Sequence, residues 1–478
     1  MDRTYLLREI LKIEPEEGRP LALLLGHAFF VGVAIVAFYS VSSALFLTAF
    51  PSNMLPYVYL AAAGVSTLTG GIYSRFEKRL PIGTVLMGTL VFLFLSVVVF
   101  RVGLLWMDAQ WPAFGMMVWH TVLYALLNVE FWGLATRLFD VQQGKRLFGL
   151  LGAGEMVASV IGGLLTPLLV QLVGTPNLLL VSGVGLVLCM VTLKATVRRF
   201  GDRISASGVP QRKVTEDGYS GLLKNRYVIL IFMLYLVSIT VFFFLDFIFL
   251  DQSRRQFESQ DELARFFGVF YGVAQGLSLL LLTFVTGRFV TRFGIRAGLR
   301  VRPVVLMGCV LGMGVVGMEM GFESLFFGLV VVTKLLDLVL YRSFNRPSFL
   351  ILYQPLQPER KFSVQVTVES MVGPIAGGIA GAVLLLISWF GATGLVYLNG
   401  LILAIIVCWL AVGIPVYRAY RNALSDALVR RRLGGGTLSY GPSVVEILKA
   451  RLESPHAGDV IYALDLLEKS EGSDYQAL

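Results

Sequence analysis

The chain is built from long apolar runs that are separated by short polar segments. A helix needs about 20 apolar residues to cross roughly 30 Å of hydrocarbon, and a window of that length finds twelve such runs. Their continuous apolarity excludes a transmembrane barrel, whose strands of about ten residues alternate in polarity. Arginines crowd the entry of the ninth run. The predicted helices cover residues 21–50, 56–74, 81–105, 112–138, 146–172, 177–198, 226–250, 264–290, 302–320, 324–350, 362–390 and 395–420.

The longest polar connection divides these runs into two sets of six. It covers residues 199–225 and is predicted to be a cytoplasmic linker. The N-terminal bundle is then predicted over residues 21–198 and the C-terminal bundle over residues 226–420. The predicted fold class is therefore an all-α polytopic membrane protein with twelve transmembrane helices in two six-helix bundles.

A shared register indicates that the two halves arose by duplication. One offset of 215 residues aligns the polar turn at 142–146 with the turn at 357–361. The same offset aligns Gly162-Gly163 with Gly377-Gly378. Parallel six-helix repeats are a transporter architecture in which the substrate site lies near the midplane, between the halves.

Lysine and arginine fall on alternate connections between the predicted helices. The links at 51–55 and 173–177 carry none, whereas the link at 75–79 and every second link after it are rich in them. By the positive-inside rule, both termini are predicted to be cytoplasmic. Residues 1–20 are predicted to form a cytoplasmic interfacial segment, not a cleavable signal. Residues 251–265 mix four acids with three arginines and are expected to form a short amphipathic helix on the outer side.

The composition agrees with a membrane location for most of the chain. Of 478 residues, 56% are hydrophobic and 15% are charged, and the mean hydropathy is +0.75. Soluble domains carry about a quarter charged residues, so a soluble protein is excluded. The net charge of +9, from 40 Lys and Arg against 31 Asp and Glu, would suggest nucleic acid in a soluble protein. In a membrane protein the net charge reflects the excess of Lys and Arg on the cytoplasmic connections. The lipid bilayer is therefore expected as a partner, and nucleic acid is not.

The last part of the chain changes in character. Residues 421–442 contain three consecutive glycines and are predicted to form a hinge. Residues 443–478 resemble one HEAT-type helical repeat, opened by a capping box from Ser443 to Glu446. A single repeat cannot bury its own apolar face. Either this tail docks on the cytoplasmic loops, another subunit or a cytoplasmic partner, or the natural protein continues beyond Leu478.

The sequence contains no constellation typical of an enzyme. The glycine cluster at 149–154 follows a turn and opens a membrane helix, so it does not match a nucleotide-binding fingerprint, and no Walker A motif occurs. The three cysteines lie in apolar runs without a CxxC pair or a histidine cluster. We therefore expect no catalytic residues, no metal site, no cofactor and no ATP hydrolysis.

Ionisable residues within membrane spans are costly and are candidates for function. The predicted substrate-binding residues are mostly on the fourth and tenth spans, where many of them recur at steps of three or four residues and so share a helical face. A second group is assigned to proton coupling or gating. The substrate-binding set is Tyr39, Asn128, Glu130, Lys334, Asp337, Tyr341, Arg342, Asn345 and Arg346; the coupling or gating set is Arg137, Arg146, Glu155 and Glu369.

Structural interpretations of the same residues stay open at this level. Lys334 and Asp337 are spaced to pair within their own helix, with the arginines reaching the cytoplasmic surface. Glu155 and Glu369 could instead pair with Arg137 or Arg346 between helices. His27 is a weaker candidate, and Asp246 is expected to lie too close to the outer surface to take part.

The basic residues suggest an anionic substrate. Guanidinium groups bind phosphate and carboxylate oxygens through two hydrogen bonds at once. Positive-inside bias also supplies arginines at these helix ends. The residues concerned are Arg137, Arg146, Lys334, Arg342 and Arg346.

Three short motifs resemble the ATP:ADP antiporter (nucleotide transporter) family of the major facilitator superfamily. They are the stretch at 131–135 (Phe-Trp-Gly-Leu-Ala), the turn at 144–149 (Gly-Lys-Arg-Leu-Phe-Gly) and the segment at 353–356 (Tyr-Gln-Pro-Leu). The resemblance covers roughly residues 1–425, and the tail is similar to the HEAT extension of bacterial members. The resemblance to this family implies two six-helix bundles, alternating access and exchange of nucleotides or phosphate compounds without hydrolysis. Where nucleotide exchangers of this family carry Thr-Lys-Glu, this chain has Ser-Phe-Leu at 348–350.

The sequence therefore predicts a secondary transporter or exchanger of an organic anion, a nucleotide or phosphorylated metabolite, in a bacterial inner membrane. The alternative is a transporter-like membrane sensor or scaffold that signals through its HEAT-like tail, by self-association or by contact with a cytoplasmic partner. Transport of a labelled nucleotide distinguishes the two hypotheses.

Overall fold

The computed structural model describes residue 14 and residues 17–139, 141–206, 225–317, 323–356, 364–365, 367–389 and 395–431. Within these ranges the chain is almost entirely helical. The predicted HEAT-like tail and most of the predicted linker and interfacial segment lie outside the described residues.

The first half of the chain forms six long helices. Each covers one of the first six predicted spans, because each apolar run is closed by residues that turn the chain, such as Pro51 and the positive-φ Gly174. The helices are α2 Gly18–Ala49, α3 Leu55–Arg79, α4 Ile82–Trp106, α5 Gln110–Leu138, α6 Val141–Val173 and α7 Leu178–Ala206.

The second half contains helices that are interrupted by three π-helical turns. Such turns add a residue to a helix and occur frequently at functional sites. The helices are α9 Arg226–Gln256, α10 Gln260–Leu281, α11 Gly287–Val316, α12 Glu323–Leu340, α13 Arg346–Leu352, α15 Gly373–Trp389 and α16 Leu395–Arg431; the π-helical turns are η3 Leu282–Thr286, η4 Tyr341–Asn345 and η5 Val368–Val372.

Ten stretches of the described chain are long and apolar enough to cross a membrane. One of them, Gln260–Val316, has 57 residues and would measure about 86 Å as one straight helix. Gly294, with φ of 75° and ψ of 172°, breaks it. A further apolar helix, Gly373–Trp389, is 17 residues long. The ninth helix therefore starts just after Gly294, and not at residue 302 as the sequence predicted.

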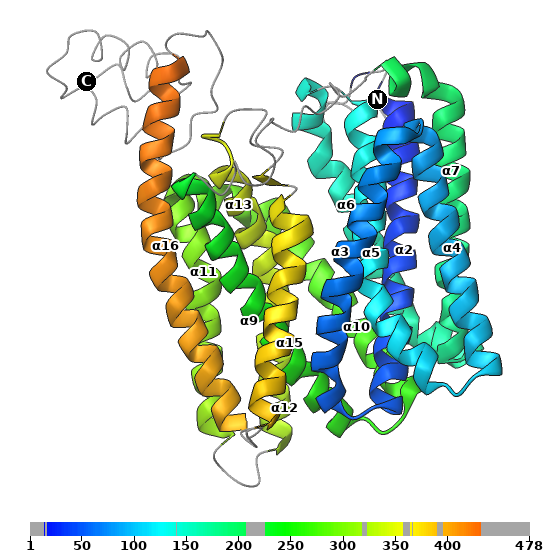
Figure 1. Ribbon diagram of the computed structural model, residues 1–478, viewed down its shortest axis with the longest axis vertical. Helices are drawn as coiled ribbons and strands as arrows, with labels where there is room; N and C mark the ends of the chain where they lie inside the picture. Colours follow the sequence, from blue (N-terminus) through cyan, green and yellow to red (C-terminus); the bar gives the residue numbers. More distant parts are fainter. Residues whose placement is uncertain are drawn as a thin grey trace, which may run out of the picture.

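The helices run between two ends of the molecule (Figure 1). At the upper end α2 begins and α16 ends; at the lower end the chain turns near Pro51, Gly174 and Phe257. The predicted amphipathic helix at 251–265 is not a separate element, because α9 continues to Gln256 and α10 starts at Gln260. A capping box formed by Ser259 and Glu262 opens α10 instead.

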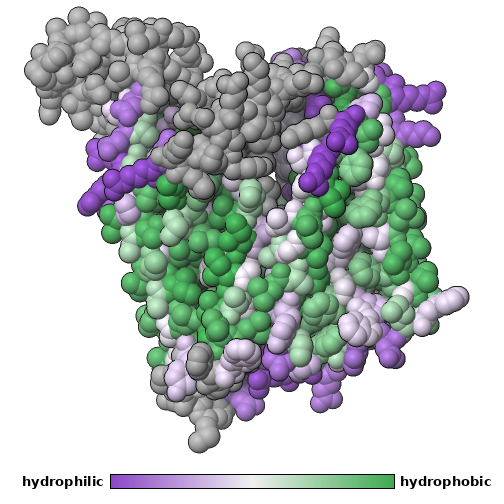
Figure 2. All heavy atoms as spheres, in the orientation of Figure 1, coloured by the Kyte–Doolittle hydropathy of each residue, from purple (hydrophilic) through white to green (hydrophobic). Residues whose placement is uncertain are grey.

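The outer surface of the bundle is suited to lipid. Figure 2 shows hydrophobic side chains over the middle of the molecule and the most hydrophilic ones toward its two ends. Large apolar side chains such as Leu172, 70% exposed, point outward, which is costly in water and favourable in a bilayer. Trp106, Trp111 and Trp389 lie exposed at the lower ends of their helices, as in the aromatic belt of membrane proteins.

The two halves meet along helices from each. In Figure 1, α2 to α7 lie on the right, and α9 and α11 to α16 lie on the left. Helix α10 packs against α6 and α2, and α15 packs against α3. The approach of α6 and α10 is very close, because a Cβ atom on Gly163 would lie 2.7 Å from the Cα atom of Gly272. Glycine is required there for backbone contact.

Candidate functional site

Two tyrosines join the two halves inside the helical bundle. The Tyr39 hydroxyl on α2 and the Tyr271 hydroxyl on α10 are 2.7 Å apart. Their rings are T-shaped, and the ring of His120 on α5 also contacts Tyr39, with centroids 4.5 Å apart. Tyr39 lies ten residues before the end of α2, which places it about 15 Å from the lower end.

A buried ion pair lies at the same depth. The Lys334 ammonium on α12 is 2.7 Å from the Asp246 carboxylate on α9, and both side chains are largely buried. The Lys334 Nζ atom also lies 3.8 Å from the centre of the Phe242 ring, a favourable cation–π position. From the other half, the Tyr59 hydroxyl on α3 donates to Asp246 over 3.2 Å. We define Tyr39, Tyr59, Asp246, Tyr271 and Lys334 as the midplane cluster.

Asp246 lies deeper than the sequence predicted. It is 8% exposed and sits ten residues before the end of α9, so it is about 15 Å from the lower end. The prediction failed because the apolar run was ended at residue 250, whereas the helix continues through polar residues to Gln256. Tyr59 and Tyr271 were missed altogether, because nothing in the sequence distinguishes them from other tyrosines of membrane helices.

A second group of polar residues gathers around Tyr124 on α5. Arg342 and Arg346 from the C-terminal half, and Glu155 from α6, lie close enough to the Tyr124 hydroxyl to act on it electrostatically. All four side chains are partly exposed. We call these four residues the arginine layer. Arg342 has no acidic partner among the residues that the structure describes, so its charge is available to an anion.

Arg342 lies in the π-helical turn η4, and Arg346 opens α13. Arg346 borders a small cavity together with Tyr235, Tyr341 and Asn345. The π-helical turn offsets the side chains by one residue from the register of α12. The helical face that the sequence predicted as one stripe is therefore divided, and its members have different surroundings.

Asp337 faces the interior of the C-terminal half. One of its carboxylate oxygens accepts hydrogen bonds from Nε and Nη2 of Arg302, at 2.9 and 2.7 Å. Both side chains are fully buried. The Arg302 guanidinium also donates to Ser238 over 2.8 Å and lies 5.0 Å from the ring centre of Tyr341. Lys334 and Asp337 thus pair with residues of other helices and not with each other.

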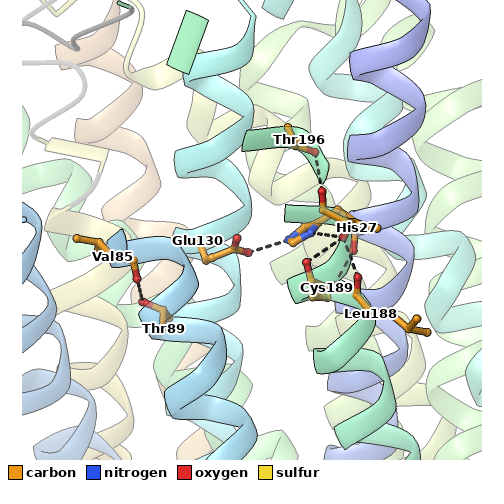
Figure 3. Close-up of polar contacts among 8 residues, drawn as sticks. His27, Val85, Thr89, Glu130, Leu188, Cys189 and Thr196 are labelled. Atoms are coloured by element: carbon orange, nitrogen blue, oxygen red, sulfur yellow. Dashed lines mark hydrogen bonds and ion pairs between the residues drawn. The ribbon is translucent and has the colours of Figure 1, made fainter. Parts of the chain in front are cut away.

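Glu130 is enclosed within the N-terminal half. Its Oε2 atom lies 2.9 Å from Nε2 of His27, and both side chains are fully buried (Figure 3). The other ring nitrogen of His27 is 2.8 Å from the Thr192 hydroxyl on α7. Glu130 therefore does not share the exposed surroundings of the arginine layer.

The remaining predicted residues are scattered. The Asn128 amide donates to the carbonyl oxygen of Tyr124 in its own helix. Arg137 lies 4.0 Å from Glu77 at the upper end, and Asn345 is buried with its amide 3.4 Å from Ser238. Arg146 lies in α6 and Glu369 in η5, but their side chains are outside the described part of the structure.

Polar contacts hold the halves together at the lower end. The Thr175 hydroxyl donates to Asp261 over 2.7 Å, and Nε of Arg254 donates to the carbonyl oxygen of Leu47 over 2.8 Å. Ser52 also bonds to Asp251. Each contact joins the N-terminal half to α9 or α10. Among the described residues, no group of three or more His, Cys, Asp or Glu side chains could hold a metal ion.

Sequence comparisons identify related transporters. The sequence model of the Major Facilitator Superfamily matches residues 133–341. The ADP,ATP carrier protein 1 of Chlamydia muridarum is 23% identical over 210 residues, and that of Chlamydia trachomatis serovar D is 22% identical over 210 residues. Each alignment covers 40% of this chain and 39% of the carrier, so the chain spans about two-fifths of the length of these curated relatives.

Solved structures share the fold over most of the chain. A bacterial homologue of the iron transporter ferroportin in its inward-facing state has a TM-score of 0.60 at 17% identity, and covers 83% of this chain and 98% of its own. The nucleoside transporter NupG has a TM-score of 0.57 at 13% identity, over 83% of this chain and 98% of its own. The D-xylose-proton symporter has a TM-score of 0.58 at 12% identity, over 83% and 96%. The chain therefore has the major facilitator fold.

Proposed function

We propose that this polytopic membrane protein, a transporter of the major facilitator type, exchanges a nucleotide or another phosphorylated anion across the membrane without hydrolysing it. The observation that carries the proposal is the arginine layer, in which Arg342 and Arg346 lie partly exposed and face Tyr124 of the other half. Arg342, which has no acidic partner among the described residues, can bind a phosphate group through two hydrogen bonds at once.

The midplane cluster provides the second half of the proposed path. Lys334 is held by Asp246, which also accepts a hydrogen bond from Tyr59 across the interface. A phosphate that reaches Lys334 competes with Asp246 for the ammonium group. Its arrival would weaken the contact between α3 and α9 that Asp246 maintains, so that substrate binding and opening of the lower end are linked.

The proposed topology has twelve spans, with the Gln260–Val316 stretch counted as two and Gly373–Trp389 as one. The two bundles are proposed over residues 21–198 and 226–420. The upper end is proposed to be cytoplasmic, because the basic connections between helices lie there. The polar contacts at the lower end, such as that of Thr175 with Asp261, then close the outer side, as expected for an inward-facing transporter.

The test is counterflow of labelled ADP into liposomes preloaded with unlabelled ADP or ATP. Each charge-assisted hydrogen bond contributes about 1.5–3 kcal/mol, so Arg342→Ala is expected to weaken apparent affinity by roughly 10- to 150-fold. Arg288→Ala is the matched control, because the side chain of this exposed arginine bonds to the carbonyl oxygen of Phe284 one turn earlier and belongs to neither cluster. Its kinetics should equal those of the wild type.

Two results contradict the proposal. Wild-type protein that takes up neither nucleotides nor other phosphorylated anions is not the proposed exchanger. Equal affinity for ADP in the wild type and in Arg342→Ala and Arg346→Ala removes the arginine layer from the binding site, whatever the transported solute.

A further inference from the structure

The His27–Glu130 pair is a buried ionisable site that the proposed anion path does not use. His27 lies on α2 and Glu130 on α5, and their side chains are fully buried, 2.9 Å apart. Figure 3 shows the Glu130 carboxylate pointing at the His27 ring, with α7 on the far side of the ring. Phe131 stacks on the same ring, with centroids 6.2 Å apart. Two groups that exchange protons with water are thus enclosed in an apolar bundle, which is costly for any unpaired charge.

The contact with Thr192 allows either tautomer of neutral His27. The Thr192 hydroxyl is 3.0 and 2.9 Å from the carbonyl oxygens of Leu188 and Cys189. When its single hydrogen is used within α7, its oxygen accepts from Nδ1–H of His27 at 2.8 Å; when the hydroxyl donates to Nδ1 instead, Nε2–H donates to Glu130. In both tautomers His27 brings one proton to the pair.

One further proton then serves the contact between His27 and Glu130. If it resides on Nε2, the pair is an imidazolium and a carboxylate; if it resides on Oε2, both groups are neutral. The net charge is zero in either case. Loss of this proton to water leaves a neutral imidazole beside a carboxylate, with a net charge of −1 in either tautomer. Burial in an apolar bundle therefore favours the net-neutral pair, which holds the transferable proton.

The charged and titratable neighbours do not compensate the deprotonated form. Tyr73 on α3 and Cys189 on α7 lie within electrostatic reach of Glu130, and both are neutral groups that become negative on ionisation. Arg137 acts on Tyr73, but its contact at 4.0 Å is with Glu77. The second carboxylate oxygen of Glu130 has no hydrogen-bond partner among the described residues. Release of the proton therefore requires a rearrangement that brings water or a cation to Glu130.

We infer that His27 and Glu130 form a proton-binding site that couples proton movement to transport. The inference rests on the proposed transport function, but it concerns a second substrate, the proton. The site is held by α2, α5 and α7 of one half, so a movement of these helices relative to one another changes its access to water. Arg137, Glu77 and Tyr73 mark a polar route from the site toward the upper end.

The first experiment needs no transported solute. Purified protein in detergent is titrated with acid and base, while infrared spectroscopy follows the absorption of protonated carboxyl groups and of the protonated histidine ring. The wild type should show a titrating carboxyl or imidazolium band that is lost in Glu130→Gln. In Thr192→Val the band should remain and its pH midpoint should fall, because the imidazolium loses the acceptor of a charge-assisted hydrogen bond. Thr89→Val, whose hydroxyl bonds only to the Val85 carbonyl in its own helix, should titrate as the wild type does.

The second experiment measures coupling in liposomes that contain a pH-sensitive dye, with labelled ADP as the probe. Glu130→Gln mimics the permanently protonated carboxyl group. It should retain exchange of ADP for ADP at nearly the wild-type rate, and lose both the accumulation driven by an imposed pH gradient and the change in dye signal. A structural role alone would instead lower exchange and accumulation together, in proportion to the folded protein.

The outcomes separate this inference from the proposed function. Wild-type protein without a titrating carboxyl or imidazolium band, or a band that survives in Glu130→Gln, overturns the proton site. ADP exchange without any proton movement in the wild type also overturns it. Absence of ADP transport together with a titration that Thr192→Val shifts contradicts the proposed substrate and leaves the proton site supported. Thr192→Val keeps the test decisive if Glu130→Gln fails to fold.

Discussion

Removing the Asp337 carboxylate should destabilise the C-terminal half severely. Arg302 is fully buried and donates two hydrogen bonds to Asp337, at 2.9 and 2.7 Å. In Asp337→Ala the guanidinium stays buried and keeps only its bond to Ser238 and its contacts with the rings of Tyr341 and Trp409. Breaking a buried pair from one side costs about 3–5 kcal/mol, which is roughly two to three and a half powers of ten in the unfolding equilibrium.

Asp337→Asn and a double variant separate charge from geometry. The asparagine oxygen can still accept both hydrogen bonds, so its cost should be smaller, at about 1–3 kcal/mol. Arg302→Met combined with Asp337→Leu removes both charges, and replacement of a buried pair by apolar residues is often neutral or stabilising. Unfolding is followed in mixed micelles of dodecylmaltoside and SDS. The reasoning would be refuted if Asp337→Ala were as stable as the wild type, or if the double variant were less stable than Asp337→Ala.

Two further changes test the packing of the halves and the start of α10. Gly163→Leu should force α6 and α10 apart, because even a Cβ atom at this position would lie 2.7 Å from the Cα atom of Gly272. A cysteine introduced at Thr175, which is buried at the lower end, should then react faster with a thiol reagent. Gly149→Leu should leave the labelling rate unchanged, because a Cβ atom there meets nothing within 4 Å. Ser259→Ala removes the capping box of α10 and should cost about 1 kcal/mol. The cost should appear as faster hydrogen exchange in the first turn of α10, and an unchanged rate there would contradict the role of the cap.

The arrangement of helices was predictable because the membrane imposes a simple rule on the sequence. Backbone groups in hydrocarbon must bond within their own segment, so each apolar run becomes a helix and each cluster of turn residues ends one. The rule fails where polar residues continue a helix past the apolar run. This is why α9 extends to Gln256 and why the break before the ninth helix is at Gly294, ahead of the arginines that obscured it.

The partners of the buried charges could not be predicted in the same way. Spacing along one helix identifies Lys334 and Asp337 as neighbours on the same face, but it does not show which residues of other helices approach them. Arg302 was read as part of the basic entry of a helix, and the structure places it inside the bundle, against Asp337. Tertiary packing alone determines that Lys334 pairs with Asp246 instead.

The most deeply buried charged side chains of this protein occur as pairs. His27 with Glu130, Arg302 with Asp337 and Lys334 with Asp246 are each enclosed as a pair, because an isolated charge in an apolar interior would neutralise or disrupt the packing. Each pair joins two helices of a single half. The pair of Lys334 with Asp246 also lies beside the contact of Tyr59 with Asp246, where the halves meet.

Arg342 departs from this rule, since it is partly exposed and has no acidic partner among the described residues. A guanidinium within the bundle is compatible with the low dielectric of the membrane only where water or a counter-charge can reach it. For this reason we expect an anionic substrate to bind first at the arginine layer, and not at the buried residues Glu130, Lys334 and Asp337, which the sequence placed in the same substrate-binding set.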